Sequence, residues 1–335
     1  MRRTFTHSFL LVVVLLAGAE LAMRTFYARG LSGRFDYGYH PTAGFQENAD
    51  GSVNLVRAGG RKFLPQHYRQ RKPDGIFRIM VVGDSVPRGP SLRDAYAAKV
   101  AELLRQRGIS AEGWNLCLPG YGAQRCHIVL QKALNYSPDF VIRHLNNSNE
   151  YEDERERRRS QDRRDWHPNN TLMMSVLVRR LHEIKTENIF WPLLPEKIRA
   201  QQGVNDAAAE TAASMDEERI RVWKERVRDF LAQDIAACRE AGVPMLLVTQ
   251  VRVRGSGKES TMDDSGLDAL AESFAAPDVA VLSMKQALSA LDFVPLFMDT
   301  AHLLPKGHEV LAGAIVEKMD RTGALRQTGA AVRKP

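Results

Sequence analysis

The chain has 335 residues, 44% of them hydrophobic and 26% charged, which is the composition of an ordinary globular protein with one large domain and extensions, or with two modest domains. The formal net charge of +7 predicts a basic surface, which is either simply solvated or attracted to anionic lipid headgroups or an acidic polymer. No basic stripe interleaved with aromatic residues is present, so we expect no nucleic-acid partner.

The three cysteines argue against a scaffold built on disulfides, because their number is odd and they form no CxxC pair. No cluster of cysteine and histidine has the spacing of a zinc site, and we expect neither a metal nor a cofactor. A Cys117–Cys126 bridge is conceivable in an exported domain. We expect buried free thiols instead, since Cys238 lies on the apolar face of a predicted helix.

Residues 1–25 have the pattern of an export signal, because Arg2 and Arg3 precede a largely apolar run that extends to Met23. We favour an uncleaved signal anchor with a single membrane span. Small residues at 17–19 keep open a cleaved signal peptide, which would release an exported soluble form. The positive-inside rule places the remaining chain on the periplasmic or extracytoplasmic side of the cell membrane.

Residues 26–75 predict an extension with short hairpins, one of which turns at 48–51, and a turn at 72–75 closes it. After it, apolar runs alternate with amphipathic segments. The predicted strands cover 77–82, 114–118, 140–145, 245–249 and 279–282, and the predicted helices cover 91–107, 123–134, 220–235 and 307–319. This alternation predicts a three-layer α/β/α sandwich with a mainly parallel five-stranded sheet over residues 76–322, followed by a tail at 323–335.

The alternation is interrupted at 152–215, which we interpret as an insertion over the face of the sheet where ligands would bind. It begins with mixed charges at 152–159, which are typical of an exposed helix with internal ion pairs. The apolar segment at 189–195 contains two prolines and cannot form a long helix. A lid, a substrate wall, a membrane-facing loop and a plain surface insertion all stay open.

Parallel sheets bind ligands beyond the carboxyl ends of their strands, and Ser85 stands there as part of Gly83-Asp84-Ser85 after the first predicted strand. A serine becomes a nucleophile when a base takes its proton. Asp299 and His302 suit that task, because an Asp three residues before a His, on a helical turn or in a tight loop, can orient the imidazole and stabilise its charged form. The plainer interpretations are a helix cap and a structural histidine.

Acyl transfer also needs hydrogen-bond donors for the negative charge that develops on the carbonyl oxygen. The candidates are the backbone N–H groups of Ser85 and Gly120 and the side-chain amide of Asn149, which follow the first three predicted strands. A turn glycine would explain Gly120 equally well, and a helix cap would explain Asn149.

Taken together and in this order, the motifs resemble the four blocks of the SGNH/GDSL hydrolase superfamily over about residues 76–320. The nucleophile block, the glycine block, the Gly-x-Asn-Asp block and the Asp-x-x-His block correspond to Gly83-Asp84-Ser85, Asn115–Gly122, Asn147-Ser148-Asn149-Glu150 and Asp299-Thr300-Ala301-His302. The resemblance implies a flavodoxin-like SGNH fold, a triad of Ser85, His302 and Asp299, and Gly120 and Asn149 in the oxyanion hole. The N-terminal segment looks like that of membrane-anchored bacterial members.

The chain departs from the family pattern at Glu150, where the family usually has Asp, and at Asn147, where it usually has Gly. Arg88, close to the nucleophile, either favours an anionic substrate or faces solvent as an ordinary loop residue. We interpret His308 as structural and His144 as the second choice for a polar role in the pocket. No other histidine has an Asp partner at useful spacing.

The expected function is hydrolysis of esters outside the cytoplasm, with no cofactor. For an exported, anchored member, the resemblance suggests O-acyl groups, such as O-acetyl esters, on envelope carbohydrate. The same triad could instead pass the acyl group to a sugar hydroxyl, as an O-acyltransferase does. A lipid esterase or thioesterase is a third possibility, and a non-catalytic carbohydrate-binding or assembly factor is a fourth.

Overall fold

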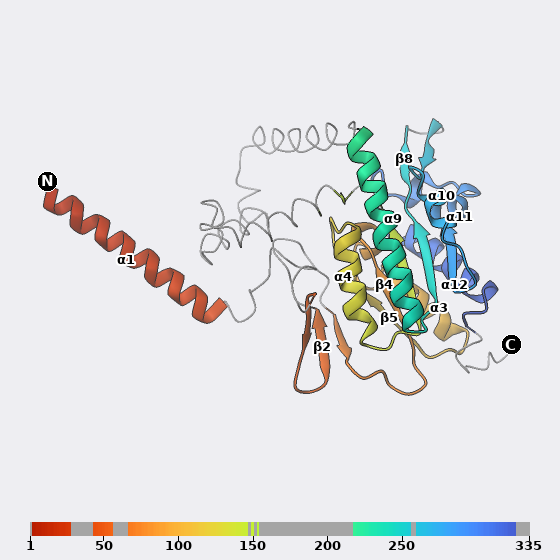
Figure 1. Cartoon of the computed structure of the whole chain (residues 1–335), viewed down its shortest axis with the longest axis horizontal. Coiled ribbons are helices and arrows are strands. Elements are labelled where there is room, and N and C mark those ends of the chain that lie inside the picture. The colour runs from red at the N-terminus through yellow and green to blue at the C-terminus, as the bar shows by residue number, and fades with distance from the viewer. Residues whose placement is uncertain are drawn as a thin grey trace.

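The computed structural model describes residues 2–27, 43–55, 66–146, 149–150, 153, 217–255 and 259–325. Within these residues, five parallel strands form the central sheet (Figure 1). They lie side by side in the order β10 (Val279–Ser283), β7 (Met245–Thr249), β6 (Phe140–Leu145), β4 (Phe77–Val82) and β5 (Ala111–Asn115). Of the strands in this sheet, β4 comes first in the chain and lies between the second, β5, and the third, β6. This order makes the carboxyl ends of β4 and β6 the topological switch point where doubly wound sheets bind ligands.

Helices cover both faces of the sheet, which confirms the predicted three-layer α/β/α class. One face carries α3 (Tyr96–Gln106), α11 (Met284–Ser289) and α12 (Pro305–Arg321). The other carries α4 (Ala123–Leu134), α9 (Glu217–Glu240) and α10 (Leu267–Glu272). Alternate residues of β4 serve the two cores, as the period of two in a strand requires: Ile79 and Val81 face α3, whereas Met80 and Val82 face α4. Figure 1 shows α4 and α9 packed alongside each other.

Arg78 is the one charged residue in the buried strand β4, and its side chain is fully buried. Its guanidinium lies 4.5 Å from the centre of the Trp114 ring, donates to the backbone carbonyl oxygens of Arg69 and Tyr136, and pairs with Glu112. A buried cation is tolerated when its donors are satisfied in this way. Arg78 thus fastens the amino end of β4 to the segments around it.

A small antiparallel sheet of β1 (Phe45–Glu47), β2 (Ser52–Leu55) and β3 (His67–Arg69) lies next to the edge strand β5. The predicted hairpin turn at 48–51 is confirmed. The ring of Tyr68 on β3 stacks on Trp114 with 4.0 Å between centroids, and Gln66 exchanges two hydrogen bonds with the backbone of Asn115 at 2.8 and 3.0 Å. These contacts join the extension to the central sheet.

Four predicted elements match the structure at both ends, namely β4, α4, β6 and β7. The strand predicted at 114–118 is wrong in its bounds, since β5 covers Ala111–Asn115. The buried residues after it still bond to the β4 side, because the N–H of Leu116 donates to Val81 at 2.8 Å and that of Leu118 to Gly83 at 3.2 Å. The helix predicted at 91–107 begins only at Tyr96, because Ser91 and Asp94 form a turn before it. A 3₁₀ turn, η5 (Val294–Leu296), precedes the loop that carries Asp299 and His302.

The N-terminal segment is a helix, α1 (Arg2–Tyr27), and its apolar side chains from Phe9 to Leu16 are exposed. The sequence predicts a membrane span here. Within the described part of the chain, however, no helix has the length and apolar character needed to cross a bilayer, so the structure does not support that prediction. The predicted insertion at 152–215 lies outside the described residues, apart from Asp153.

Candidate active site

The nucleophile turn begins where β4 ends. Gly83 has no side chain, and a Cβ there would lie 2.6 Å from Cγ of Pro87 and 2.9 Å from Cβ of His144, so only glycine fits. Ser85 then opens a short helix, α2 (Ser85–Arg88), which is capped by Asp84, whose carboxylate accepts from the N–H of Val86 at 3.0 Å. Ser85 therefore lies at the carboxyl edge of the sheet, in the first turn of a capped helix.

The partner loop is a tight turn between two paired residues, Phe297 and Leu303. One carboxylate oxygen of Asp299 accepts from the N–H groups of Ala301 and His302, both at 2.8 Å. Its other oxygen lies 2.7 Å from Nδ1 of His302. Burial acts to raise the pKa of Asp299, but these hydrogen bonds together hold it below its ordinary value. The carboxylate thus shapes the loop and orients the imidazole at the same time.

The structure brings the two loops together across 217 residues of sequence. Nε2 of His302 lies 2.8 Å from Oγ of Ser85. Because Asp299 accepts from Nδ1–H, Nε2 is left as the acceptor for the serine hydroxyl proton. Nucleophile, base and orienting carboxylate form one continuous hydrogen-bonded chain, with both distances in the normal range.

Asn149 connects the third motif to the first, because its side-chain amide donates to the second carboxylate oxygen of Asp84 at 2.9 Å. Its backbone N–H is bonded to Asn146, so the turn after β6 is fixed as well. Asp84 is buried, and this burial raises the pKa of Asp84 to about 6, although the N–H of Val86 opposes the shift. Asp84 therefore holds the Ser85 helix and the Asn149 amide in one arrangement.

The glycine block lies between β5 and α4, and Gly120 in it adopts a left-handed conformation with φ of +73°. Its carbonyl oxygen accepts from the guanidinium of Arg125, which also forms a buried ion pair with Asp153. Gly122 comes just before α4, where a Cβ would lie 2.7 Å from Cβ of Asp153. Packing this close requires glycine and fixes the loop that carries the Gly120 N–H.

Glu150, the departure from the family pattern, caps the start of α4. Its carboxylate accepts from the N–H of Ala123 at 2.6 Å, while Asp153 accepts from Gly122 at 3.0 Å and from Arg125 at 3.2 Å. Both positions are explained by side-chain oxygens that accept from the N–H groups left free at the start of a helix. Burial, together with the nearby Asp153 carboxylate, raises the pKa of Glu150 to about 8. The longer Glu side chain is therefore used to support the glycine block.

The two other histidines near the site do not take part in the hydrogen-bonded chain. His144 is buried beneath Gly83, with Nδ1 3.3 Å from the hydroxyl of Tyr96, and burial lowers the pKa of His144 to about 3. His308 is buried on α12 beside the same tyrosine ring, and burial lowers the pKa of His308 to about 4. Both are neutral side chains packed behind the nucleophile turn. Arg88 is half-buried and donates to the carbonyl of Gly89.

The sequence offers no other histidine an Asp partner at useful spacing, but the structure pairs His127 with an Asp that is distant in the chain. Asp234 on α9 is fully buried and lies 2.8 Å from Nδ1 of His127 and 2.9 Å from Nε of Arg143. Its partners stand 107 and 91 residues away in the chain, so no local spacing could have indicated them. This network joins α9, α4 and β6 behind the site.

Within the described residues, no group of three or more histidine, cysteine, aspartate or glutamate side chains could hold a metal ion. Cys117, Cys126 and Cys238 are buried free thiols. Burial raises the pKa of the Cys126 thiol, and likewise that of the Cys238 thiol, to about 12, so neither is a nucleophile at neutral pH. Ser85 is the side chain whose surroundings suit nucleophilic attack.

No family model and no curated protein matches the sequence. Solved structures resemble it at low identity. A lipase/acylhydrolase from Enterococcus faecalis is 16% identical, with a TM-score of 0.43 over 73% of this chain and 95% of that one. An acetyl xylan esterase is 12% identical, with a TM-score of 0.44 over 72% and 98%. A GDSL-like lipase from Bacteroides thetaiotaomicron is 9% identical, with a TM-score of 0.39 over 73% and 88%. Likenesses this distant do not decide an activity, which has to be derived from the geometry of the site.

Proposed function

We propose that this chain is a serine ester hydrolase of the SGNH/GDSL kind, with Ser85 as the nucleophile, His302 as the base and Asp299 as the residue that orients it. The observation that carries the proposal is the pair of hydrogen bonds that joins them, 2.8 Å from His302 to Ser85 and 2.7 Å from His302 to Asp299. The order of the four motifs in the chain and the sheet topology support the same interpretation.

The reaction follows from this geometry. Oγ of Ser85 attacks the ester carbonyl carbon while its proton passes to Nε2 of His302, and Asp299 stabilises the imidazolium that forms. The tetrahedral intermediate collapses as the alcohol leaves with that proton, and the acyl group stays on Ser85. Water then attacks the acyl-enzyme, again giving up a proton to His302, and the acid is released as Ser85 recovers its proton.

The negative charge on the carbonyl oxygen needs donors, and we assign them to Ser85, Gly120 and Asn149. Two observations support this assignment. Within the described part of the chain, the backbone N–H groups of Ser85 and Gly120 have no acceptor, and the Asn149 amide uses one of its two hydrogens on Asp84. Loss of the Asn149 amide should therefore lower kcat by roughly 100- to 1000-fold.

The openness of the site favours hydrolysis over transfer of the acyl group to a sugar hydroxyl. The side chains of His302 and Asp299 are 36% and 48% exposed in the described part of the chain, so water can reach the acyl-enzyme. A non-catalytic binding or assembly factor is disfavoured, because such a protein has no use for a serine held 2.8 Å from an oriented imidazole. O-acyl esters of carbohydrate, such as O-acetyl esters, are the substrates that we propose.

The location outside the cytoplasm is a separate part of the proposal. It is supported by the Arg2-Arg3 start and by the exposed apolar side chains of α1 from Phe9 to Leu16. Cell fractionation followed by N-terminal sequencing tests it. A mature N-terminus at Glu20 would indicate a cleaved signal peptide, an intact chain in the membrane fraction would indicate an anchor, and an intact chain in the cytoplasmic fraction would contradict export.

The activity is tested with p-nitrophenyl acetate and the purified full-length chain beside Ser85→Ala and His302→Ala. We expect turnover by the wild type and loss of nearly all of it in both variants. A folded wild type that is no faster than its variants would refute the hydrolase and leave a strict transferase or a binding protein. A fluorophosphonate probe gives a second readout, since only an activated Ser85 should be labelled.

A further inference from the structure

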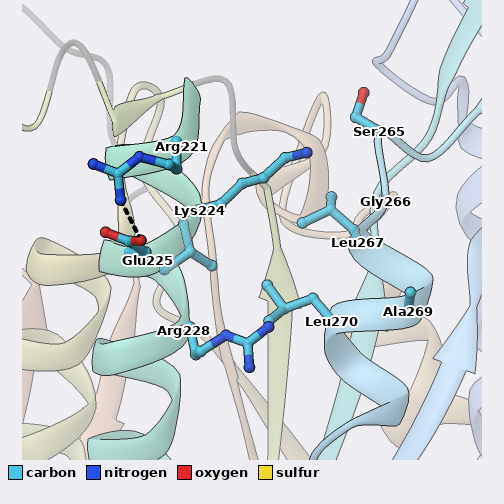
Figure 2. A pocket seen from close by; sticks show the side chains of 10 residues that line it. Arg221, Lys224, Glu225, Arg228, Ser265, Gly266, Leu267, Ala269 and Leu270 are labelled. Carbon is cyan, nitrogen blue, oxygen red and sulfur yellow. Dashed lines mark hydrogen bonds and ion pairs between the residues drawn. The ribbon is translucent and has the colours of Figure 1, made fainter. Parts of the chain in front are cut away.

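A groove separates the N-terminal half of α9 from α10 on the α4 side of the sheet (Figure 2). Its volume is about 280 Å³. The floor is apolar and includes Val227 from α9 and Leu267 and Leu270 from α10. The α9 rim carries the basic residues Arg221, Lys224 and Arg228, which follow each other at helical spacing and so share one face of the helix.

Two of these cations are not neutralised. Arg221 is 2.6 Å from Glu225, its neighbour one turn further along the helix. Among the described residues, by contrast, no carboxylate lies within ion-pair distance of Lys224 or Arg228. Figure 2 shows both side chains reaching across the groove toward α10, and a Cβ on Gly266 would lie 4.0 Å from the Lys224 ammonium. The groove therefore offers two positive charges, about one helical turn apart, above an apolar floor.

The acidic residues of the groove rim and of the segment before Ser265 do not cancel this charge, because Glu225 is paired with Arg221 and the two aspartates before Ser265 have cations of their own. Asp263 accepts from Arg254 at 2.7 Å, and Asp264 lies 3.5 Å from Lys285. The net charge of +7 for the whole chain has the same sign as the groove. An anion approaching this face is thus attracted both by the groove and by the protein as a whole.

The groove leads toward the catalytic loop. Ser265 and Leu267 line it and also line a smaller hollow next to β8 (Arg252–Arg254) and β9 (Thr261–Asp263). On β8, the N–H of Val253 donates to the carbonyl of Thr300 at 2.7 Å, inside the Asp299–His302 turn. Since α10 packs on β7 and β10, the groove lies over the part of the sheet whose strand β7 is two strands from β4.

We propose that this groove binds the carboxylate groups of an acidic polysaccharide, whose O-acyl ester then reaches Ser85. The proposal rests on the proposed esterase function and specifies its substrate class as a polymer of acidic sugars. Lys224 and Arg228 pair with carboxylates on neighbouring sugar units, and the apolar faces of the sugar rings lie on Leu267 and Leu270. A neutral ester as small as p-nitrophenyl acetate does not use the groove.

Binding is measured first, without catalysis, by titrating polygalacturonate into the full-length Ser85→Ala chain in a calorimeter. Lys224→Ala/Arg228→Ala in the same background should weaken binding by roughly tenfold, since each exposed ion pair is worth a few-fold in affinity. The control is Arg107→Ala/Arg321→Ala, which removes the same charge from the opposite face of the sheet. Affinity should fall further as the ionic strength rises from about 0.15 M to about 1 M.

Hydrolysis is measured next on acetylated polygalacturonate, on the neutral acetylated glucomannan and on p-nitrophenyl acetate. In the groove variant we expect KM to rise about tenfold for the acidic polymer alone, with kcat and the other two substrates unchanged. Equal losses on all three substrates would overturn the proposal, because the groove would then support the catalytic centre instead. Lys224→Arg/Arg228→Lys should restore binding, since the charges return.

Two further results would assign the groove to another ligand and overturn the proposal. One is tighter binding of polyphosphate than of polygalacturonate, lost in the Lys224→Ala/Arg228→Ala variant. The other is binding of phosphatidylglycerol vesicles, lost in the same variant, by a chain that does not bind the polysaccharide. Failure of the esterase itself is distinguishable. In that case p-nitrophenyl acetate is not hydrolysed, while Ser85→Ala still binds polygalacturonate in a way that depends on Lys224 and Arg228.

Discussion

Replacing Asp299 by Asn separates the two tasks of this carboxylate. One oxygen accepts from the backbone N–H groups of Ala301 and His302, and an Asn carbonyl oxygen can do the same, so the loop should keep its shape. The other oxygen lies 2.7 Å from Nδ1 of His302. An amide NH₂ in its place cannot accept a hydrogen bond from the ring N–H and can only donate one to the ring. The imidazole is then held in the wrong tautomer, with a hydrogen on Nε2 that faces Ser85.

The expected size of the effect follows from these contacts. In another Ser-His-Asp enzyme the wrong tautomer costs about 10⁴-fold in kcat, and we expect a loss of that order for Asp299→Asn. The free energy of unfolding should fall by less than about 1 kcal/mol, because the loop hydrogen bonds survive and the side chain is half-exposed. Asp299→Ala should lose as much activity and more stability, about 1–2 kcal/mol, since both backbone donors lose their acceptor.

The assay pairs kcat on p-nitrophenyl acetate with urea unfolding of the same preparations. In the Ser85→Ala background, Asp299→Asn should cause no further loss, because triad members act as a unit. Retention of more than a tenth of the wild-type kcat by Asp299→Asn would show that Asp299 does not set the tautomer of His302. A large loss of stability in this variant would show that the carboxylate is chiefly structural.

Three further predictions concern the surroundings of the site. Gly83→Ala should lower kcat by about 100-fold with the fold intact by circular dichroism, because its Cβ would meet Pro87 at 2.6 Å and displace the nucleophile helix. Asp234→Ala should lower the free energy of unfolding by about 3–5 kcal/mol in urea, because it leaves Arg143 buried without its counter-ion. Burial raises the pKa of Glu150 from 4.5 to about 8, so between these pH values the folded chain keeps a proton that the unfolded chain releases. The free energy of unfolding should therefore fall as the pH rises from 4.5 to 8. Glu150→Gln should make this fall smaller, as measured by urea unfolding at pH 5, 6.5 and 8.

The sheet was predictable where apolar runs end at a residue that stops them. Gly83 ends the run of β4 and Asn146 that of β6, and both predicted strands have the observed bounds. The strand β5 was misplaced because Leu116 and Leu118 after it are as apolar and as buried as the strand itself. Leu116 and Leu118 also continue the hydrogen bonding, to Val81 and Gly83, so neither the apolar pattern nor burial marks the end of the strand at Asn115.

The site was predictable where its chemistry is local. Asp299 and His302 are three residues apart, and their spacing alone indicates that the carboxylate can orient the ring. The role of Glu150 was not predictable, because its partner is the N–H of Ala123 on another element, 27 residues earlier. At the sequence level, a Glu in place of the family's Asp could be noted only as a departure. The structure shows that its additional methylene reaches the start of α4.

The contact between the N-terminal extension and the strand β5 has a consequence for how the chain can be shortened. β5 is an edge of the central sheet, and unpaired edges invite pairing with other chains. Here Gln66 occupies both backbone hydrogen-bonding groups of Asn115, and Tyr68 covers the ring of Trp114. A fragment that starts at residue 76 would expose this edge and the indole of Trp114, so it should aggregate. A fragment that starts at residue 43 keeps both covered and should stay monomeric.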